Sequence, residues 1–130
     1  MGRFLNAVLA PAALGLAMML AQPTLAADAV AGAQVFKAQC AVCHASTASA
    51  PPGVGPSLAG VVGRQSGTQS DFRARYSVAM KEAAKQWTAA NLKLYIANPA
   101  ATVPGNHMPY AGLHDLAKVD DVVAYLATLH

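Results

Sequence analysis

One stretch of the chain has residue types and spacing that are typical of a redox centre: Cys40-Ala41-Val42-Cys43-His44. Two thiols three positions apart on one helical turn can each add across a vinyl group of a haem, and the histidine that follows then lies under the iron. The chain holds no third cysteine, so neither thiol is left over for a structural bridge. We therefore expect one covalently bound haem c, attached through Cys40 and Cys43, with His44 as an axial ligand of its iron.

Other interpretations of the cysteine pair account for less of the pattern. A thioredoxin-like redox motif needs a βαβ context, and β-branched alternation nowhere persists over several residues. A zinc site needs two further ligands at paired spacing; His107 and His114 are candidates, but no second Cys pair exists. A disulfide accounts for both cysteines and leaves His44 unexplained. Haem attachment is the interpretation that uses all three residues.

The haem iron then needs a sixth ligand, or it keeps an open site. Outside the N-terminal segment the candidate methionines are Met80 and Met108. Met108 follows the turn signal Pro104-Gly105, and prolines on both sides stiffen its loop, so the thioether can be held at small entropic cost. Met80 lies in a helical context, where packing is the simpler role. We expect Met108 to be the ligand and His107 to point away, because neighbours in an extended loop face opposite ways.

A histidine–methionine pair favours electron transfer over catalysis. The soft thioether favours Fe(II) and raises the reduction potential, and six-coordination leaves no position for oxygen or peroxide. We therefore expect no enzyme activity. A haem peroxidase or a gas-binding protein would need an open or labile sixth position. The four-helix gas-binding type carries its haem motif near the C-terminus, whereas the motif lies early in this chain.

The N-terminal segment predicts export. Arg3 is the only charged residue before Asp28, residues 5–21 are almost entirely apolar, and small residues precede a cleavage point after Ala26. This is the pattern of a secretory signal peptide. We assign residues 1–26 to that signal and expect the mature protein to be periplasmic.

The remainder, residues 27–130, is expected to form a single monohaem domain without a membrane span, and to be a monomer. Cleavage after Ala21 or Ala27 is an alternative, and so is an uncleaved membrane anchor. The apolar run is shorter than the roughly 20 residues that a spanning helix needs, and it contains Pro11.

Composition excludes some partners. The chain has 130 residues and a formal charge of +3, which falls to +2 without Arg3. No Lys/Arg cluster or aromatic stacking pattern is present, so we expect no nucleic acid partner. Aromatic residues make up only 6% of the chain, and a small domain of this kind is marginally stable without a covalently held macrocycle in its core.

The element pattern indicates an all-α fold of short helices and loops. Caps and apolar spacing define the helices: Asp28 and Thr88 are expected to cap two of them, and Asn98-Pro99 ends the second. A stripe of apolar residues at helical spacing marks the last helix. We expect helices over 28–39, from 78 to between 80 and 84, over 89–97 and over 116–129, with loops over 45–70 and 98–114.

Beyond the haem motif, several segments in this order and spacing resemble the class I cytochrome c family, of the mitochondrial and purple-bacterial electron-carrier type. The resemblance covers essentially the whole mature chain and implies the small cytochrome c fold wrapped around one haem. The segments are Gly55-Pro56-Ser57-Leu58, Tyr76-Ser77-Val78-Ala79-Met80 followed by Trp87, Tyr95-Ile96-Ala97-Asn98-Pro99, Val103-Pro104-Gly105-Asn106-His107-Met108, and Asp121-Val122-Val123-Ala124-Tyr125-Leu126.

The resemblance also implies roles for matching positions. Pro56 offers its carbonyl to the ring N–H of His44, which fixes the tautomer. Tyr95 lies near the Met108 sulfur. Contacts between the first and last helices involve Gly32, Phe36 and Tyr125. Arg64, Tyr76 and Trp87 serve the haem propionates. Asn106 stands where the family often has Thr, and it can still hydrogen-bond a propionate.

Two features of the sequence depart from the family pattern. The lysines that surround the haem edge in family members that dock to oxidases are sparse here, and His107 replaces a common lysine. Met80 stands where the family often has a buried Asn. The resemblance implies a one-electron carrier that docks transiently with redox partners, a membrane complex or dehydrogenase as donor and an oxidase, reductase or reaction centre as acceptor. The alternative is a dedicated electron-accepting subunit of one periplasmic dehydrogenase.

Overall fold

The computed structural model describes residues 26–130, and the predicted signal peptide lies outside them except for its last residue. Within this part of the chain the regular structure is helical, and no strand forms apart from one isolated bridge between Gln65 and Gln86. The elements are α1 (Ala29–Gln39), η1 (Ser70–Arg75), α2 (Val78–Glu82), α3 (Ala89–Ala97), α4 (Pro99–Thr102) and α5 (Leu116–Leu126).

The helix starts follow from side-chain caps. Asp28 accepts hydrogen bonds from Val30 N and Ala31 N, Ser77 accepts one from Met80 N, and Thr88 accepts one from Asn91 N. Such caps satisfy backbone donors that the first helical turn leaves unpaired. The predicted boundaries of the first and third expected helices, 28–39 and 89–97, are confirmed to within one residue.

The expected loop over 98–114 is wrong at its beginning, where α4 forms. Pro99 occupies the first helical position, where its missing N–H costs nothing, and the Asn98 side chain accepts a hydrogen bond from Ala101 N at 3.1 Å. Asn98 therefore ends α3 and begins α4. The last helix is also shorter than expected: it ends at Leu126, and Thr128 Oγ1 donates to the carbonyl of Tyr125 at 2.7 Å.

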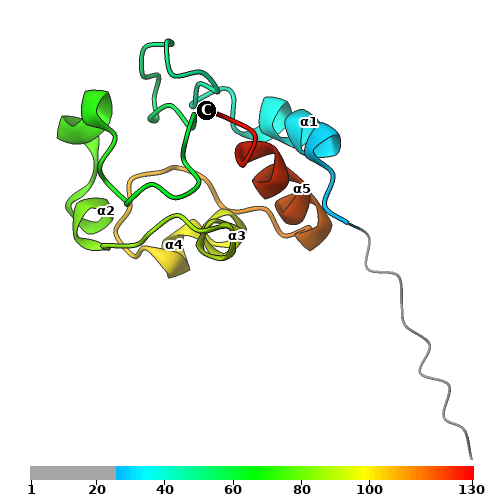
Figure 1. Ribbon diagram of the computed structural model, residues 1–130. Coiled ribbons are helices and arrows are strands. Elements are labelled where there is room, and N and C mark those ends of the chain that lie inside the picture. The colour runs from blue at the N-terminus through cyan, green and yellow to red at the C-terminus, as the bar shows by residue number, and fades with distance from the viewer. Residues whose placement is uncertain (1–25) are drawn as a thin grey trace, which may run out of the picture.

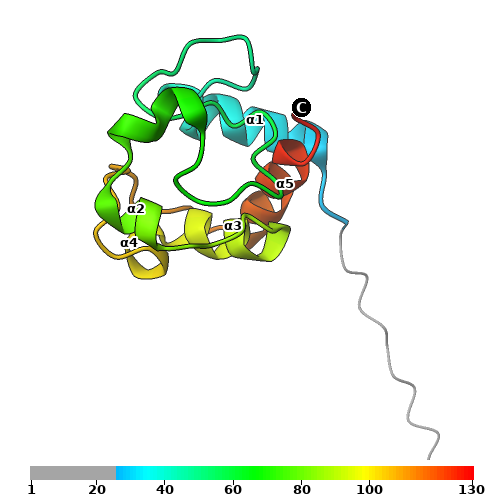
Figure 2. The same ribbon diagram turned by 60° about the vertical axis from the view of Figure 1, so that its left-hand side comes forward.

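Helices α1 and α5 pack directly against each other, and α3 contacts both α5 and α4. Figure 1 shows α1 and α5 side by side. In Figure 2, α3 and α4 lie at the bottom of the view, opposite α1 at the top. None of the helices in residues 26–130 is long and apolar enough to cross a membrane.

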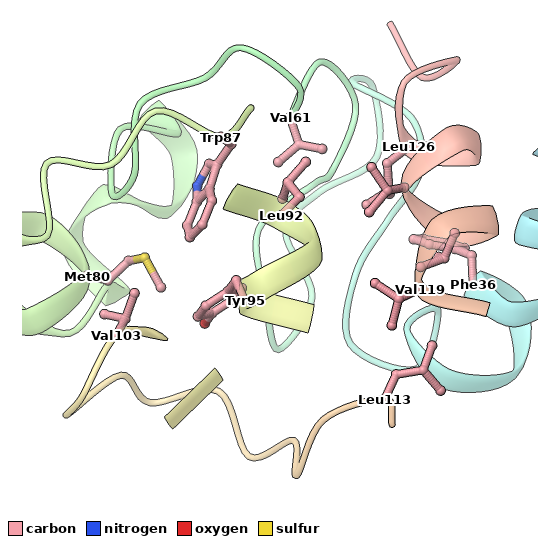
Figure 3. Packing of buried hydrophobic residues seen from close by; sticks show 12 residues of the cluster. Phe36, Val61, Met80, Trp87, Leu92, Tyr95, Val103, Leu113, Val119 and Leu126 are labelled. Carbon is pink, nitrogen blue, oxygen red and sulfur yellow. The ribbon is translucent and has the colours of Figure 1, made fainter. Parts of the chain in front are cut away.

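The buried apolar side chains form two groups around the middle of the molecule (Figure 3). One group joins α1 to α5, and the other lies between α2, α3 and the segment after α4. Val61 and Leu92 lie between the groups in this view. The first group includes Phe36, Leu113, Val119 and Leu126, and the second includes Met80, Trp87, Tyr95 and Val103.

Candidate haem site

A cavity of about 330 Å³ lies between the two groups of core residues, and its lining is mainly apolar. Its volume falls within the range of roughly 300–1,000 Å³ that is usual for small-molecule and cofactor sites. The side chains of Cys40, Cys43 and His44 line it, and so does that of Met108, which is distant in the sequence. The fold thus brings the expected attachment and ligand residues to one cavity.

The two cysteines are free thiols, each partly buried. Burial, with a smaller contribution from neighbouring Cys43, raises the pKa of Cys40 to about 11. A thiol with so high a pKa carries little thiolate near neutral pH, and thiolate is the nucleophile of redox-active cysteines. This environment argues against Cys40 as the attacking thiol of a thiol–disulfide redox centre.

His44 is held by the loop that precedes η1. Its Nδ1 donates to the carbonyl of Pro56 at 2.8 Å, which leaves Nε2 with its lone pair free. Burial lowers the pKa of His44, and the hydrogen bond to Pro56 opposes this shift only in part. A Cβ at Gly55 would lie 2.6 Å from His44 Nδ1, so only glycine lets this loop approach the ring. The result is a neutral, oriented imidazole, the form that binds metals.

Met108 is positioned by two polar side chains, Asn106 from its own loop and Tyr95 from α3. Asn106 Oδ1 accepts a hydrogen bond from Met108 N at 2.9 Å, and the Tyr95 hydroxyl lies 3.9 Å from Met108 Sδ. The turn that starts this loop is the predicted one, because Asn106 N donates to Val103 O at 3.1 Å and Gly105 has a φ of +84°. A thioether is a soft iron ligand, and the donor set of two thiols, an imidazole and a thioether around an apolar cavity fits a covalently bound haem.

Comparison with known proteins decides the family. The profile of the cytochrome c family matches residues 29–130. The chain belongs to the cytochrome c family. Membership implies a covalently bound haem c and a role in electron transport, and the Cys40–His44 motif supplies the attachment pattern.

Individual cytochromes support this assignment. The chain is 46% identical to cytochrome c2 of Rhodomicrobium vannielii over 105 residues, 81% of this chain and 82% of that protein. It is 45% identical to cytochrome c2 of Blastochloris viridis over 104 residues, 80% of each chain. The solved structure of cytochrome cH from Methylobacterium extorquens superposes with a TM-score of 0.71 at 42% identity and covers 78% of this chain and 98% of that one. The small all-α cytochrome fold is therefore confirmed.

Three residues expected at the propionate side of this cytochrome all line the cavity: Arg64, Tyr76 and Trp87. Arg64 donates to the carbonyl of Ser57 at 3.0 Å and also to that of Ala59. Burial lowers the pKa of Arg64, and the neighbouring Tyr76 opposes this shift. Burial raises the pKa of Tyr76, and Arg64 opposes that shift. Arg64 and Tyr76 therefore present paired hydrogen-bonding groups to a mainly apolar space.

Asn106 was expected to serve a propionate, and in this structure its side chain binds the backbone of its own loop. Its Nδ2 donates to the carbonyls of Pro99 at 3.1 Å and Val103 at 2.9 Å, while its Oδ1 accepts from Met108 N and, at 3.4 Å, from the Tyr95 hydroxyl. Both amide hydrogens are committed to the backbone, and the residue is not part of the cavity lining. It holds the loop together, and its role toward a propionate stays a prediction.

Met80 is buried, as expected of a packing residue, and it also lines the cavity. His107, which was expected to point away, also lines the cavity. So do two residues that sequence reasoning did not single out, Gln39 and Tyr110, whose side chains meet at 2.9 Å. Tyr110 follows the expected ligand by two positions and Gln39 precedes the first cysteine. That adjacency to the motifs was the only sequence signal, since 71 residues separate the two.

Proposed function

We propose that this cytochrome is an exported one-electron carrier whose haem iron is bound by His44 and Met108, with the ring attached through Cys40 and Cys43. The observation that carries this proposal is the meeting of all four side chains at one apolar cavity. Three of the four come from the end of α1 and the turn after it, and Met108 comes from the loop after α4. A site filled from two separate segments suits a six-coordinate iron.

The haem supplies reversible one-electron chemistry when it is bound. The chain's residues fix the conditions for it. Pro56 keeps the Nδ1 proton of His44 in place, so that Nε2 remains available to the metal. Met108 adds a soft ligand that favours the reduced state. With both axial positions filled by protein, no position remains for oxygen or peroxide, and we infer that the protein carries electrons and is not an enzyme.

Donors at the polar end of the cavity complete the proposed site. Arg64, Tyr76 and Trp87 would receive the propionates, whose burial without hydrogen-bond donors would be costly. Tyr95 acts on the ligand and not on the propionates. It is buried, and its hydroxyl lies against the Met108 thioether. Burial raises the pKa of Tyr95 to about 12, so it stays a neutral hydrogen-bond donor beside the sulfur.

We propose the periplasm as its location and redox proteins as its partners, because the N-terminal segment predicts export and the chain resembles two proteins named cytochrome c2. Its docking would be brief and small in area. Two of the sparse lysines are already engaged in exposed ion pairs, Lys93 with Asp120 at 2.7 Å and Lys118 with Asp115 at 3.5 Å. This distribution does not favour a lysine-dominated docking surface.

The axial ligation is tested by replacing Met108 with Ala in the haem-loaded protein. We expect loss of the ferric thioether–iron absorption band and new binding of carbon monoxide to the reduced form. His107→Ala is the matched control, because it removes the neighbouring ligand candidate and should leave the band intact. An unchanged spectrum in Met108→Ala would exclude Met108 as the ligand.

Attachment is tested separately by mass. The purified periplasmic protein should have the mass of residues 27–130 plus one haem, and the haem should remain with the protein under denaturing conditions. The double replacement of Cys40 and Cys43 by Ala should release it. A mass without haem would contradict the proposal, and a mass that includes residues 1–26 would contradict cleavage of the signal.

A further inference from the structure

The segment that follows Met108 makes few hydrogen bonds to the rest of the molecule. Among the hydrogen bonds of residues 26–130, residues 109–112 make a local one, from Tyr110 N to Met108 O at 2.9 Å, and one to a separate element. That second bond joins the Tyr110 hydroxyl to Gln39 Oε1 at 2.9 Å. Tyr110 also packs against the core, and Gly112 lies against the backbone of Ala97. The Tyr110–Gln39 bond is therefore the one hydrogen bond from the middle of the loop to the helical framework.

The two ends of the same loop are held more firmly. Asn106 fixes the beginning through four side-chain hydrogen bonds. At the end, Leu113 N donates to Ile96 O at 2.9 Å, and Leu113 is only 8% exposed. A segment with firm ends and a loosely held middle opens locally without global unfolding.

The position of Gln39 gives its hydrogen bond a specific consequence. Gln39 is the last residue of α1 and directly precedes Cys40. Tyr110 lies two residues after Met108, and both Gln39 and Tyr110 line the cavity. The bond therefore connects the segment that anchors the haem to the segment that supplies the thioether, across 71 residues of sequence.

We propose that the Gln39–Tyr110 hydrogen bond is a latch that keeps the Met108 loop closed and the thioether on the iron. This inference rests on the ligation proposed above. Tyr110 acts as a positioning residue, since its hydroxyl reaches Gln39 and has no role in binding the metal. Breaking the latch raises the population of the open loop, in which an added ligand can replace Met108.

The test is imidazole binding to the oxidised, haem-loaded protein at a fixed pH of about 7, followed by loss of the thioether–iron band. The apparent affinity for imidazole scales with the fraction of open loop. Tyr110→Phe keeps the ring and removes only the hydroxyl. We expect it to bind imidazole about 2- to 10-fold more tightly, the effect of losing one hydrogen bond of ordinary net strength.

Substitutions at the other end of the bond separate the latch from a general effect of Tyr110. Gln39→Met keeps the side-chain length without a strong acceptor and should match Tyr110→Phe. Gln39→Glu keeps an acceptor oxygen and should bind imidazole no more tightly than the parent protein. Gln34→Met changes an exposed residue of the same helix and should leave the affinity unchanged.

The double variant Gln39→Met/Tyr110→Phe should equal either single variant, because each already breaks the same bond. Affinities that multiply in the double variant would overturn the latch, as would single variants within 1.5-fold of the parent, about a quarter kcal/mol. In either case an intact thioether band in the parent shows that the proposed ligation still stands. A parent protein without that band would overturn the ligation and the latch together.

Discussion

The α1–α5 contact and the Met108 loop enclose the same cavity, and they are held by different forces. At the contact, the two helix backbones approach so closely at Gly32 that an added Cβ would meet the main chain of Asp121. Phe36 is 5% exposed and its ring centroid lies 5.3 Å from that of Tyr125. Figure 1 shows the two helices side by side. Close packing of the two helices therefore stabilises this side of the molecule.

The Met108 loop depends on polar contacts. Met108 itself is only partly buried, and Asn106, Tyr95 and Tyr110 hold the loop through hydrogen bonds. Each such bond contributes a modest net free energy, whereas a packed helix contact resists any change of volume. One side of the cavity is thus a rigid support for haem attachment, and the other is a ligand segment that can open locally.

The largest effect is expected at the rigid side, from Gly32→Ala. Helix propensity alone would make this change favourable by about 1 kcal/mol. The clash with the Asp121 carbonyl should instead reduce the free energy of unfolding by about 3 kcal/mol or prevent folding, because backbone atoms cannot move aside. Denaturant unfolding of the haem-loaded protein measures this change in the free energy of unfolding.

The matched control is Ala38→Val, which adds bulk on the exposed face of the same helix and should change stability by less than about 0.5 kcal/mol. If Gly32→Ala is more stable than the parent, propensity dominates and the two helices are not in close contact at this residue.

A smaller loss is expected from Asn106→Ala on the loop side. The change removes two hydrogen bonds to the backbone of Pro99 and Val103 and frees the amide of Met108. At a net contribution of about 1 kcal/mol each for the well-formed bonds, with partial replacement by water, stability should fall by about 2 kcal/mol.

The spectroscopic band of the thioether should disappear at lower denaturant concentration than helical structure does, because the loop opens first. Asn91→Ala serves as control, since its side chain makes a single hydrogen bond, to Gln86 O at 2.8 Å. Coincident loss of both signals in Asn106→Ala would mean that the loop is no weaker than the helix contact.

Much of the rigid side was predictable from the sequence because its determinants are local. Asp28 caps α1 as predicted, the apolar spacing of α5 defines its buried face, and Cys40–His44 carries the attachment pattern within five residues. The turn at Pro104-Gly105 is local as well, since proline and a glycine with positive φ occupy the positions that a type II turn requires.

The loop side was less predictable because its contacts join distant backbone groups. The Asn106 amide meets the Pro99 carbonyl, which exists as a nearby acceptor only because α4 turns the chain there. The Gln39–Tyr110 bond depends on how α1 and the loop are placed across the cavity. No periodicity or capping pattern contains that information.

A weak effect is expected from Tyr95→Phe. The hydroxyl lies 3.9 Å from Met108 Sδ and 3.4 Å from Asn106 Oδ1, distances typical of weak hydrogen bonds. Since the ring remains to fill the core against Trp87, the free energy of unfolding should change by less than about 1 kcal/mol. The position of the thioether band should shift while the band persists. Loss of the band would mean that this hydroxyl, and not Asn106, holds Met108 in place.

The smallest effect concerns pH at the rigid side, through the Asp115 cap of α5. A hydrogen bond from the backbone N–H of Lys118 holds the pKa of the Asp115 carboxyl below its ordinary value of 3.8. A lowered pKa means that the folded state favours the carboxylate, so the cap's contribution is present above about pH 4 and is lost as the pH falls through the lowered pKa. Asp115→Ser keeps a capping oxygen that does not titrate. The stability difference between the parent and this variant should therefore diminish between pH 5 and pH 2, as measured by denaturant midpoints, and a constant difference would assign the cap's effect to shape alone.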